Sequence, residues 1–421
     1  MNRDSLDFFD LNNAIVIPMK RIYEAVLDEH FSKYDQMAFL SGPRQVGKTT
    51  VAKNILKHMG TRSKYLNWDI LSDRKCILED YESVLENLSL DLVSDKKPFL
   101  VLDEIHKYKH WKNWLKGLSD LTKSHLNLLV TGSSKLNTFR RGGDSLMGRY
   151  FLYRVHPFSV AELLRTEMPD KLFSMPQKLD SDQFEALYQF GGFPEAFRTA
   201  EKRFYHRWQN LRLEQLFRED IRNMEQVEDI GQMELLAFQL RFNASQLLNY
   251  SNMANKVRVS DQTIRRWIRI LESFYYCFTL TPYSQNIARS ILKEPKVFLW
   301  DWSLVEDPGS RYENFIACHL LKAVHFWNDI GFGSFALHYV RDKEKREVDF
   351  LIIKDHKPWM LIEAKSSQKE PLSESLKHYQ KQLNAEIVLQ VALDADYSEQ
   401  DCFNLSKPVI VSAKTLLSQL I

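Results

Sequence analysis

The chain has few cysteines and almost no net charge, and each shortage excludes a class of protein. Its four cysteines are scattered over 421 residues without a C-x-x-C pair: Cys76, Cys277, Cys318 and Cys402. A disulfide framework and a structural zinc site are therefore not expected, and a reducing compartment fits this spacing. The 57 Lys and Arg residues against 55 Asp and Glu residues leave a net charge of +2. Contact with nucleic acid would therefore have to come from a local basic patch.

Long apolar runs and a secretory leader are also missing from the sequence. No segment approaches the roughly 18 consecutive apolar residues of a membrane helix, and residues 1–7 lack the basic and then apolar layout of a signal peptide. We expect a cytoplasmic protein without a membrane partner. The composition, with 44% hydrophobic and 27% charged residues, is ordinary for a globular protein, and the length allows about three domains.

One segment matches a complete nucleotide-binding motif. Residues 42–49, GPRQVGKT, satisfy the phosphate-loop pattern G-x-x-x-x-G-K-[ST]. The stretch before it, 36–40, predicts a strand and the stretch after it, 50–56, predicts a helix, so several backbone N–H groups would point at one spot. Lys48 would reach the β- and γ-phosphates, and Thr49 would hold Mg²⁺. The loop as a whole is expected to bind ATP through Gly42, Pro43, Arg44, Gln45, Val46, Gly47, Lys48, Thr49 and Thr50.

A second element of a nucleotide site lies further along. The apolar run 99–102 predicts a buried strand, and Asp103 and Glu104 follow directly, which is the layout of a Walker B motif. At the carboxyl end of such a strand Asp103 would lie beside the metal, and Glu104 would orient and deprotonate the attacking water. Strands that alternate with helices predict a doubly wound α/β domain.

Two more candidates follow the third predicted strand, 126–130. It runs into the small residues 131–134 at the same expected edge, and one of them, with Ser133 as the candidate, would contact the γ-phosphate or the attacking water. Arg149 lies on a glycine turn before the strand 150–153. It is a candidate arginine finger, in cis or from a neighbouring subunit of a homo-oligomer. A solvated surface arginine is the alternative.

The middle of the chain, about 202–284, has a helical pattern that contains a helix-turn-helix. A turn is expected at 257–259, with Ser260 as the N-cap of a second helix. The apolar face of this helix carries Ile264, Trp267, Ile268 and Leu271, and the opposite face carries Arg265, Arg266 and Arg269. The stretch 252–271 has a local charge of +4. DNA binding is the functional interpretation, and a module that packs against the rest of the protein is the structural one.

The last third carries a second group of acidic residues. Residues 293–301 are expected to be a linker that enters a strand, and 312–321 a helix that bears Glu313. Three strands follow, 335–340, 347–353 and 359–364. The second strand carries Asp349, and the third carries Glu363 and Lys365, which alternation places on one face. Carboxylates on adjacent strands with a nearby lysine can bind Mg²⁺ and activate water against a phosphodiester.

Taken in order, these motifs resemble those of the prokaryotic AAA-type ATPases that carry a nuclease-like C-terminal domain. The resemblance also rests on residues 103–106, 131–134, 146–149, 156–158 and 191–196. It implies ATP, Mg²⁺ and three domains: a P-loop ATPase domain at 1–200, a helical or winged-helix domain at 201–285 and an α/β PD-(D/E)xK, restriction-endonuclease-like domain at 286–421.

By the same resemblance, the acidic group of the last domain has assigned roles. Glu313, Asp349 and Glu363 would be metal ligands, and Lys365 would position the nucleophile. The chain departs from the family where Asp301, Trp302, Ser303 and Leu304 replace Asp-x-Gly-Leu. Two functions therefore compete. One is an ATP-regulated, Mg²⁺-dependent nuclease acting on DNA. The other is an ATP-driven switch or assembly protein whose last domain binds nucleic acid or a protein without cutting.

Overall fold

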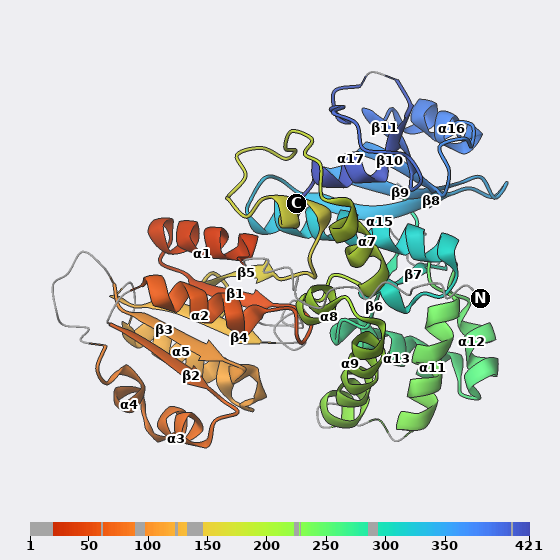
Figure 1. Cartoon of the computed structure of the whole chain (residues 1–421). Helices are drawn as coiled ribbons and strands as arrows, with labels where there is room; N and C mark the ends of the chain where they lie inside the picture. Colours follow the sequence, from red (N-terminus) through yellow and green to blue (C-terminus); the bar gives the residue numbers. More distant parts are fainter. Residues whose placement is uncertain are drawn as a thin grey trace, which may run out of the picture.

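The computed structural model of the chain describes residues 20–59, 62–88, 97–122, 125–132, 146–222, 227, 229–284, 294–405 and 407–421. The candidate Ser133 lies outside these residues. Figure 1 shows three parts: a parallel sheet with its helices, a mostly helical unit, and a second sheet that lies above the helical unit. Within the described residues, none of the helices is both long and apolar enough to cross a membrane.

The first sheet is parallel and has the strand order β2-β3-β4-β1-β5. Its strands are β1 (Met37–Ser41), β2 (Ser63–Asn67), β3 (Phe99–Asp103), β4 (Asn127–Gly132) and β5 (Tyr150–Arg154). The strands predicted at 36–40, 99–102, 126–130 and 150–153 are confirmed within two residues. Strand β2 was not predicted, because its SKYLN sequence is mostly polar. This part is therefore an α/β fold.

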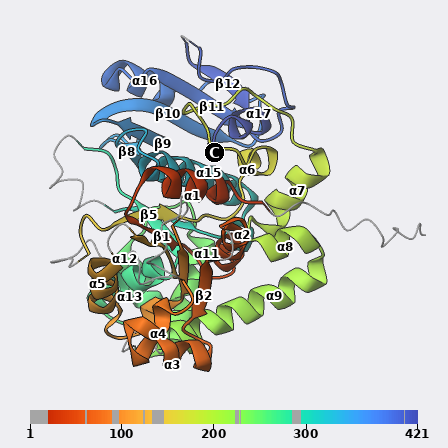
Figure 2. The same ribbon diagram turned by 90° about the vertical axis from the view of Figure 1, so that its left-hand side faces the viewer.

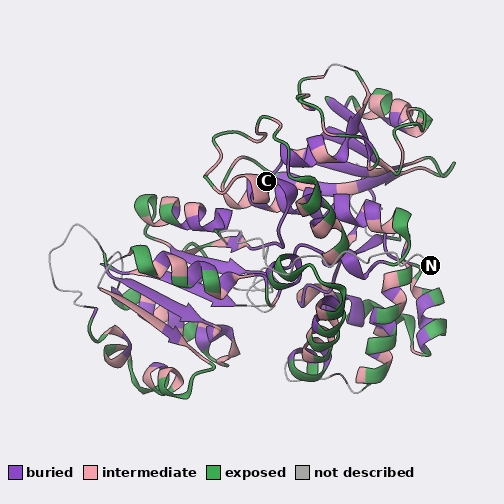
Figure 3. Ribbon diagram, viewed as in Figure 1, coloured by how far each residue is buried: buried purple, intermediate pink, exposed green. Residues whose placement is uncertain are grey.

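Alternation along β1 explains how the sheet is covered. Ala38 and Leu40 pack on one face with helices α1 (Ile22–Lys33) and α2 (Lys48–His58), whereas Met37 and Phe39 pack on the other. That second face is covered by α3 (Leu71–Glu79), α4 (Tyr81–Leu85) and α5 (Trp111–Thr122). Figure 3 shows the buried residues concentrated in the strands between these helices.

The register brings three strand ends to one edge. Ser41 of β1 pairs with Gly132 of β4, and Asp103 of β3 pairs with Thr131 of β4. Because the strands are parallel, their carboxyl ends meet there, and a crevice for a ligand forms outside them. The phosphate loop and the acidic pair, which are far apart in sequence, therefore share one edge.

The middle of the chain is mostly helical. Its elements are α6 (Val160–Leu164), α7 (Ser181–Phe190), α8 (Pro194–Thr199), α9 (Lys202–Glu214), the π-helical η4 (Gln215–Ile221), α11 (Ile230–Phe242), α12 (Tyr250–Val257) and α13 (Asp261–Ser273). The helix-turn-helix is confirmed. Arg258 has a φ of 63° at the turn, and the Ser260 side chain caps α13 by accepting from the Thr263 N–H.

The interpretation of the whole middle stretch as helical is wrong after α13. Strand β6 (Cys277–Leu280) follows and pairs antiparallel with β7 (Lys296–Leu299). The run of apolar residues there fits a short buried strand as well as a helix, and only the pairing with β7 decides. The structure thus has a helix-turn-helix followed by a small antiparallel sheet, and the winged-helix assignment stays a prediction.

The last part contains a mixed sheet with the order β12-β11-β10-β9-β8. Its elements are η5 (Trp302–Leu304), α15 (Pro308–Asp329), β8 (Phe335–Arg341), β9 (Glu347–Lys354), β10 (Lys357–Lys365), α16 (Glu374–Leu383), β11 (Ile387–Ala392), β12 (Val409–Ser412) and α17 (Ala413–Ser418). The expected helix and three strands are confirmed. Figure 2 shows the sheet between α15 and α16, which pack on opposite faces.

The first and last parts share one continuous hydrophobic core, which runs from Ile22 to Ile421. Ion pairs join them as well, because Arg154 at the end of β5 contacts Asp329 of α15 at 2.5 Å. Buried Glu162 of α6 binds both Arg21, the residue before α1, and Lys322 of α15. The last part is thus docked firmly on the first. The boundaries at 200 and 285 stay predictions.

Candidate functional site

The backbone of the phosphate loop has the shape that its glycines allow. Gln45 and Gly47 have φ angles of 61° and 98°, and the Gly47 carbonyl accepts the Val51 N–H at 3.0 Å as the first bond of α2. Gly42 lies against the chain after β5, where a Cβ would stand 2.2 Å from the Val155 carbonyl oxygen. A side chain at position 42 would therefore push the loop away from the sheet.

Lys48 is folded over this loop. Its Nζ donates to the Gly42 carbonyl at 2.9 Å and to the Pro43 carbonyl at 2.7 Å. Burial lowers the pKa of Lys48 to about 8, although Glu104 and Asp103 oppose this effect. Among the described residues no carboxylate forms an ion pair with it. An anion at the loop would therefore stabilise the charged form of Lys48.

Asp103 is the acceptor for three hydroxyl groups. Thr49 Oγ1 donates to it at 2.8 Å, and Tyr65 and Thr131 donate as well. Burial and the bond to Asp103 raise the pKa of Tyr65, so its hydroxyl stays a donor. Thr49 and Asp103 together offer the hard oxygen ligands that Mg²⁺ takes in proteins, so the chemistry of this site fits the metal. Tyr65 was missed because its strand was not predicted.

Glu104 lies next to this group in an unusual backbone conformation. It has a φ of 57°, and its N–H donates to the Thr131 carbonyl at 3.1 Å. Its Oε2 is buried without a hydrogen bond to any described residue, and His106 Nε2 and the ammonium of Lys107 each lie 3.6 Å away. Burial raises the pKa of Glu104, against the opposing charges of Lys48 and Lys107. A carboxylate in this state is a suitable proton acceptor.

A cavity of about 530 Å³ opens at this edge. Most predicted loop residues line it with Asp103 and Glu104, but so do residues that the sequence analysis did not assign: Asn67, Asp69, Lys107, Pro194, Glu195, Arg198 and Gln215. Pro194 to Arg198 belong to α8, whose start the sequence marks with a proline at its first position. The cavity is therefore closed from the side by the helical unit.

Arg149 does not lie at this cavity. Its carbonyl accepts the Met37 N–H at 2.9 Å, so it stands where β1 begins, at the edge of the sheet opposite to the phosphate loop. The strand of five residues separates the two edges by roughly 16 Å. Its side chain pairs with Asp120 at 3.0 Å. An arginine finger in cis is therefore wrong for Arg149, because the chain crosses to the far edge before β5. A role in trans stays a prediction.

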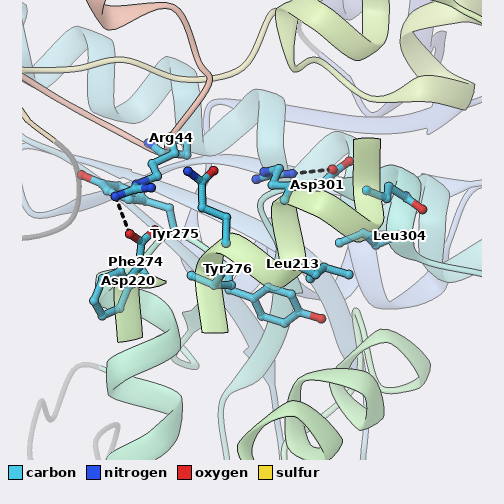
Figure 4. Close-up of a pocket in the computed structure, with 13 residues that line it drawn as sticks. Arg44, Leu213, Asp220, Phe274, Tyr275, Tyr276, Asp301 and Leu304 are labelled. Carbon is cyan, nitrogen blue, oxygen red and sulfur yellow. Dashed lines mark hydrogen bonds and ion pairs between the residues drawn. The ribbon is translucent and has the colours of Figure 1, made fainter. Parts of the chain in front are cut away.

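The phosphate loop also contacts the helical unit, and a second, smaller pocket is lined by residues of both (Figure 4). Arg44 pairs with Asp220 of η4 at 2.5 Å and with Glu219 at 3.7 Å. Burial raises the pKa of Asp220 to about 6, although Arg44 opposes the effect. Across the same pocket Arg212 of α9 binds Asp301 at 2.8 Å. Asp301 also caps η5, so the turn at 301–304 forms without the family's glycine.

The basic face of α13 is exposed. Ile264, Trp267, Ile268 and Leu271 are buried as predicted, whereas Arg265, Arg266 and Arg269 face solvent. Within the described part of the chain, none of the three arginines forms an ion pair, although Arg265 lies over the Tyr250 ring at 3.8 Å. Their charges therefore remain available to a partner.

The predicted acidic residues of the mixed sheet do come together. Asp349 of β9 accepts the Ala364 N–H at 3.0 Å, which places it beside β10. On β10, Lys365 Nζ lies 3.1 Å from Glu363 Oε1, on the same face. Burial and the charge of Asp349 raise the pKa of both Glu313 and Glu363. The structure therefore brings Glu313, Asp349, Glu363 and Lys365 together, and their roles stay predictions.

A further residue occupies the centre of the cluster. Lys296 of β7 places its Nζ 2.6 Å from Glu347, 2.9 Å from Glu313 and 3.3 Å from Asp349. No group of three or more His, Cys, Asp or Glu residues in the described ranges is arranged to hold a metal ion. The cluster of Glu313, Asp349 and Glu363 thus does not fit a metal as it stands, because an ammonium lies between the carboxylates. Lys296 was not predicted as a site residue, since its segment has the pattern of a linker that enters a strand.

Comparison with protein families divides the chain in three. Residues 34–164 match the AAA_14 model, described as an AAA domain, and so carry a P-loop ATPase domain. Residues 181–307 and 308–407 match two models described as domains of unknown function, DUF8612 and DUF4143. The second match includes β7 and Lys296. A nuclease-like last domain is not confirmed.

Whole-chain relatives and solved structures are distant. An uncharacterized protein of Methanocaldococcus jannaschii is 24% identical over 403 residues, 84% of this chain and 82% of the relative. An uncharacterized protein of Mycobacterium tuberculosis is 21% identical over 393 residues, which cover 89% of this chain and 79% of the relative. The Aeropyrum pernix ORC1 protein in complex with DNA covers 73% of this chain and 95% of its own, at 14% identity and a TM-score of 0.35. A Walker-type ATPase of Pyrococcus abyssi covers 67% of this chain and 93% of its own, at 15% identity and a TM-score of 0.41.

Proposed function

We propose that the protein is an ATP-hydrolysing switch whose helical unit contacts DNA and whose mixed-sheet domain does not cut it. The observation that carries the proposal is the cavity at the carboxyl edge of the parallel sheet. It is lined by Lys48 and Thr49 at the start of α2 and by Asp103 and Glu104 at the end of β3, which are two separate segments of the chain.

The chemistry of each group follows from its surroundings. The N–H groups at the start of α2 and Lys48 hold the phosphates, since both carry positive charge toward one point. Thr49 and Asp103 would hold Mg²⁺, which would neutralise charge on the β- and γ-phosphate oxygens. Glu104 orients the attacking water and takes its proton, because its Oε2 is buried and has no hydrogen bond to any described residue.

The first test is ATP binding. Lys48→Ala removes the cation from the loop, so the affinity for ATP should fall at least about tenfold, as for the loss of a charge-assisted hydrogen bond. Lys57→Ala is the matched control, because Lys57 is exposed on the same helix α2. Titration calorimetry measures both. Equal affinities of the two variants would refute the assigned nucleotide site.

Contact with DNA is supported by the exposed arginines of α13. Replacing Arg265, Arg266 and Arg269 together by Ala should weaken binding to duplex DNA and reduce its dependence on salt, because fewer counterions are released. The control removes the same charge from exposed positions of α9, Lys202, Arg203 and Arg207. If both triple variants bind DNA with the wild-type affinity and salt slope, the helix-turn-helix is a structural module.

A Mg²⁺-dependent nuclease is the second candidate. It is favoured by the meeting of Glu313, Asp349, Glu363 and Lys365 at one place on the mixed sheet. Lys296 in the middle of the carboxylates speaks against it. Cleavage of single- or double-stranded nucleic acid by the wild type with Mg²⁺ or Mn²⁺, lost in Asp349→Ala with ATP hydrolysis intact, would establish the nuclease and displace the switch.

A further inference from the structure

Lys296 belongs by its backbone to the helical unit. Its strand β7 pairs with β6 on one side, and on the other side it forms an antiparallel bridge with the segment that follows α11. The Ser245 N–H donates to the Val297 carbonyl at 2.7 Å, the Leu248 N–H donates to the Pro295 carbonyl at 2.7 Å, and the Val297 N–H donates to the Gln246 carbonyl at 3.2 Å. The strand packs against both α11 and α15 (Figure 1). The backbone of the helical unit therefore fixes the position of the Lys296 Cα.

Its side chain ends among the carboxylates of the mixed sheet. The three oxygen partners of Nζ come from α15 and β9, and the side chain is only 4% exposed. An ammonium has three N–H donors, so Glu313, Glu347 and Asp349 use its whole capacity. Burial alone would lower the pKa of Lys296, but these three carboxylates outweigh it and raise the pKa. Each N–H donor of the lysine thus has a carboxylate partner.

The remaining charges of the cluster are also paired within the chain. Arg341 binds the second oxygen of Glu347, and Lys365 binds Glu363. Four carboxylates, Glu313, Glu347, Asp349 and Glu363, therefore face three cations, Lys296, Arg341 and Lys365. One buried oxygen, Glu363 Oε2, has no hydrogen bond to a described residue, and its side chain is 9% exposed. The cluster needs little further positive charge.

A divalent cation would compete with Lys296 for the same oxygens. Mg²⁺ and Ca²⁺ bind carboxylate oxygens at about 2.0 to 2.6 Å, and Nζ already lies 2.6 to 3.3 Å from three of them. Both cations cannot occupy that space, and their charges repel each other at short range. The lysine has the advantage of being tethered by β7, so its local concentration is high.

We propose that Lys296 is the resident cation of this cluster and stands where a metal-dependent phosphodiesterase would hold its divalent ion. The acidic centre of the mixed sheet is therefore closed by a residue of the helical unit, and it binds no divalent cation in the native chain. The role of Lys296 in the mixed sheet is independent of ATP hydrolysis at the parallel sheet.

The test measures Mn²⁺ binding to the full chain without nucleotide, by electron paramagnetic resonance. The wild type and Asp349→Asn should bind Mn²⁺ equally, because the cluster contributes no site in either. Lys296→Gln should gain one site, at least tenfold tighter than any that the wild type offers, and Lys296→Gln with Asp349→Asn should lose it. Lys365→Gln is the matched control: it removes a lysine that contacts Glu363 at the border of the cluster and should gain no site.

Thermal unfolding gives a second measurement on the same proteins. Lys296→Gln removes the cation that Glu313, Glu347 and Asp349 share, so its melting temperature should fall, and Mn²⁺ should restore it in part by binding the folded state. The wild type should show no such rise. Mn²⁺ binding by the wild type that Asp349→Asn removes would overturn the proposal, and this comparison stands even where Lys296→Gln does not fold. Failure of a folded Lys296→Gln to gain a site would overturn it as well.

Discussion

The two acidic centres of the chain contain the same kinds of residue in opposite arrangements. At the parallel sheet, Lys48 donates to the carbonyls of its own loop, and the carboxylates of Asp103 and Glu104 face a cavity of about 530 Å³. At the mixed sheet, Lys296 donates directly to Glu313 and its neighbours and is nearly inaccessible. The difference indicates that acidic residues near a lysine can offer their oxygens to a metal ion only where the ammonium of the lysine has other hydrogen-bond acceptors.

The largest expected effect separates the two centres by catalysis. Glu104→Gln should lower the rate of ATP hydrolysis by at least about 100-fold, because the amide cannot take the proton of the water, whereas ATP still binds. The same change at the mixed sheet, Glu363→Gln, should leave the rate within about twofold of the wild type. Steady-state hydrolysis with ATP binding measured in parallel decides. Hydrolysis by Glu104→Gln at the wild-type rate would remove Glu104 as the base.

The comparison also shows what the sequence could and could not predict. The phosphate loop, the Asp103-Glu104 pair and the helix-turn-helix are local patterns, and the structure has all three where the pattern places them. Arg149 does not fit a role in cis, because a residue that precedes a strand of a parallel sheet lies at the amino edge, opposite to the phosphate loop. Its role in trans stays a prediction.

Lys296 and Tyr65 were missed for a related reason. Neither has a motif around it, and each acquires its role from strands that are distant in sequence. Tyr65 meets Asp103 because β2 pairs with β3, and Lys296 meets Glu313 because β7 packs on α15. Spacing could indicate which carboxylates gather, but it could not indicate which cation lies among them.

A smaller effect should have opposite sign at the two centres. Glu104→Gln should raise the free energy of unfolding, because burial disfavours the charge of Glu104 in the folded state. Glu347→Gln should lower it by about 1 to 3 kcal/mol, because Lys296 and Arg341 lose a partner. Urea unfolding at neutral pH measures both. Destabilisation by Glu104→Gln with a neutral Glu347→Gln would reverse the comparison.

The pH dependence of the same two variants follows from their pKa values. The pKa of Glu104 is raised above its usual 4.5, so as pH falls from 7 toward 4.5 the folded wild type takes up a proton before the unfolded chain and gains stability relative to Glu104→Gln. Burial would also raise the pKa of Glu347, but Lys296 and Arg341 lower it below 4.5. Its contribution is present above pH 4.5 and is lost as pH falls through the lowered value.

The smallest effect concerns the link between the nucleotide site and the helical unit. Asp220 has a pKa of about 6, raised from 3.8 by burial and only partly offset by Arg44. At pH 7 both the folded and the unfolded chain carry the ionised carboxylate. As pH falls through 6 the folded chain alone takes up a proton, so the wild type should gain about 1 kcal/mol relative to Asp220→Asn between pH 6 and pH 5.

Glu219→Gln, at the exposed neighbour that lies 3.7 Å from Arg44, is the control and should show no such gain. Urea unfolding of the three proteins at pH 7, 6 and 5 measures the differences. A parallel pH dependence of the wild type and Asp220→Asn would show that Asp220 stays ionised over this range and that its pKa is not raised.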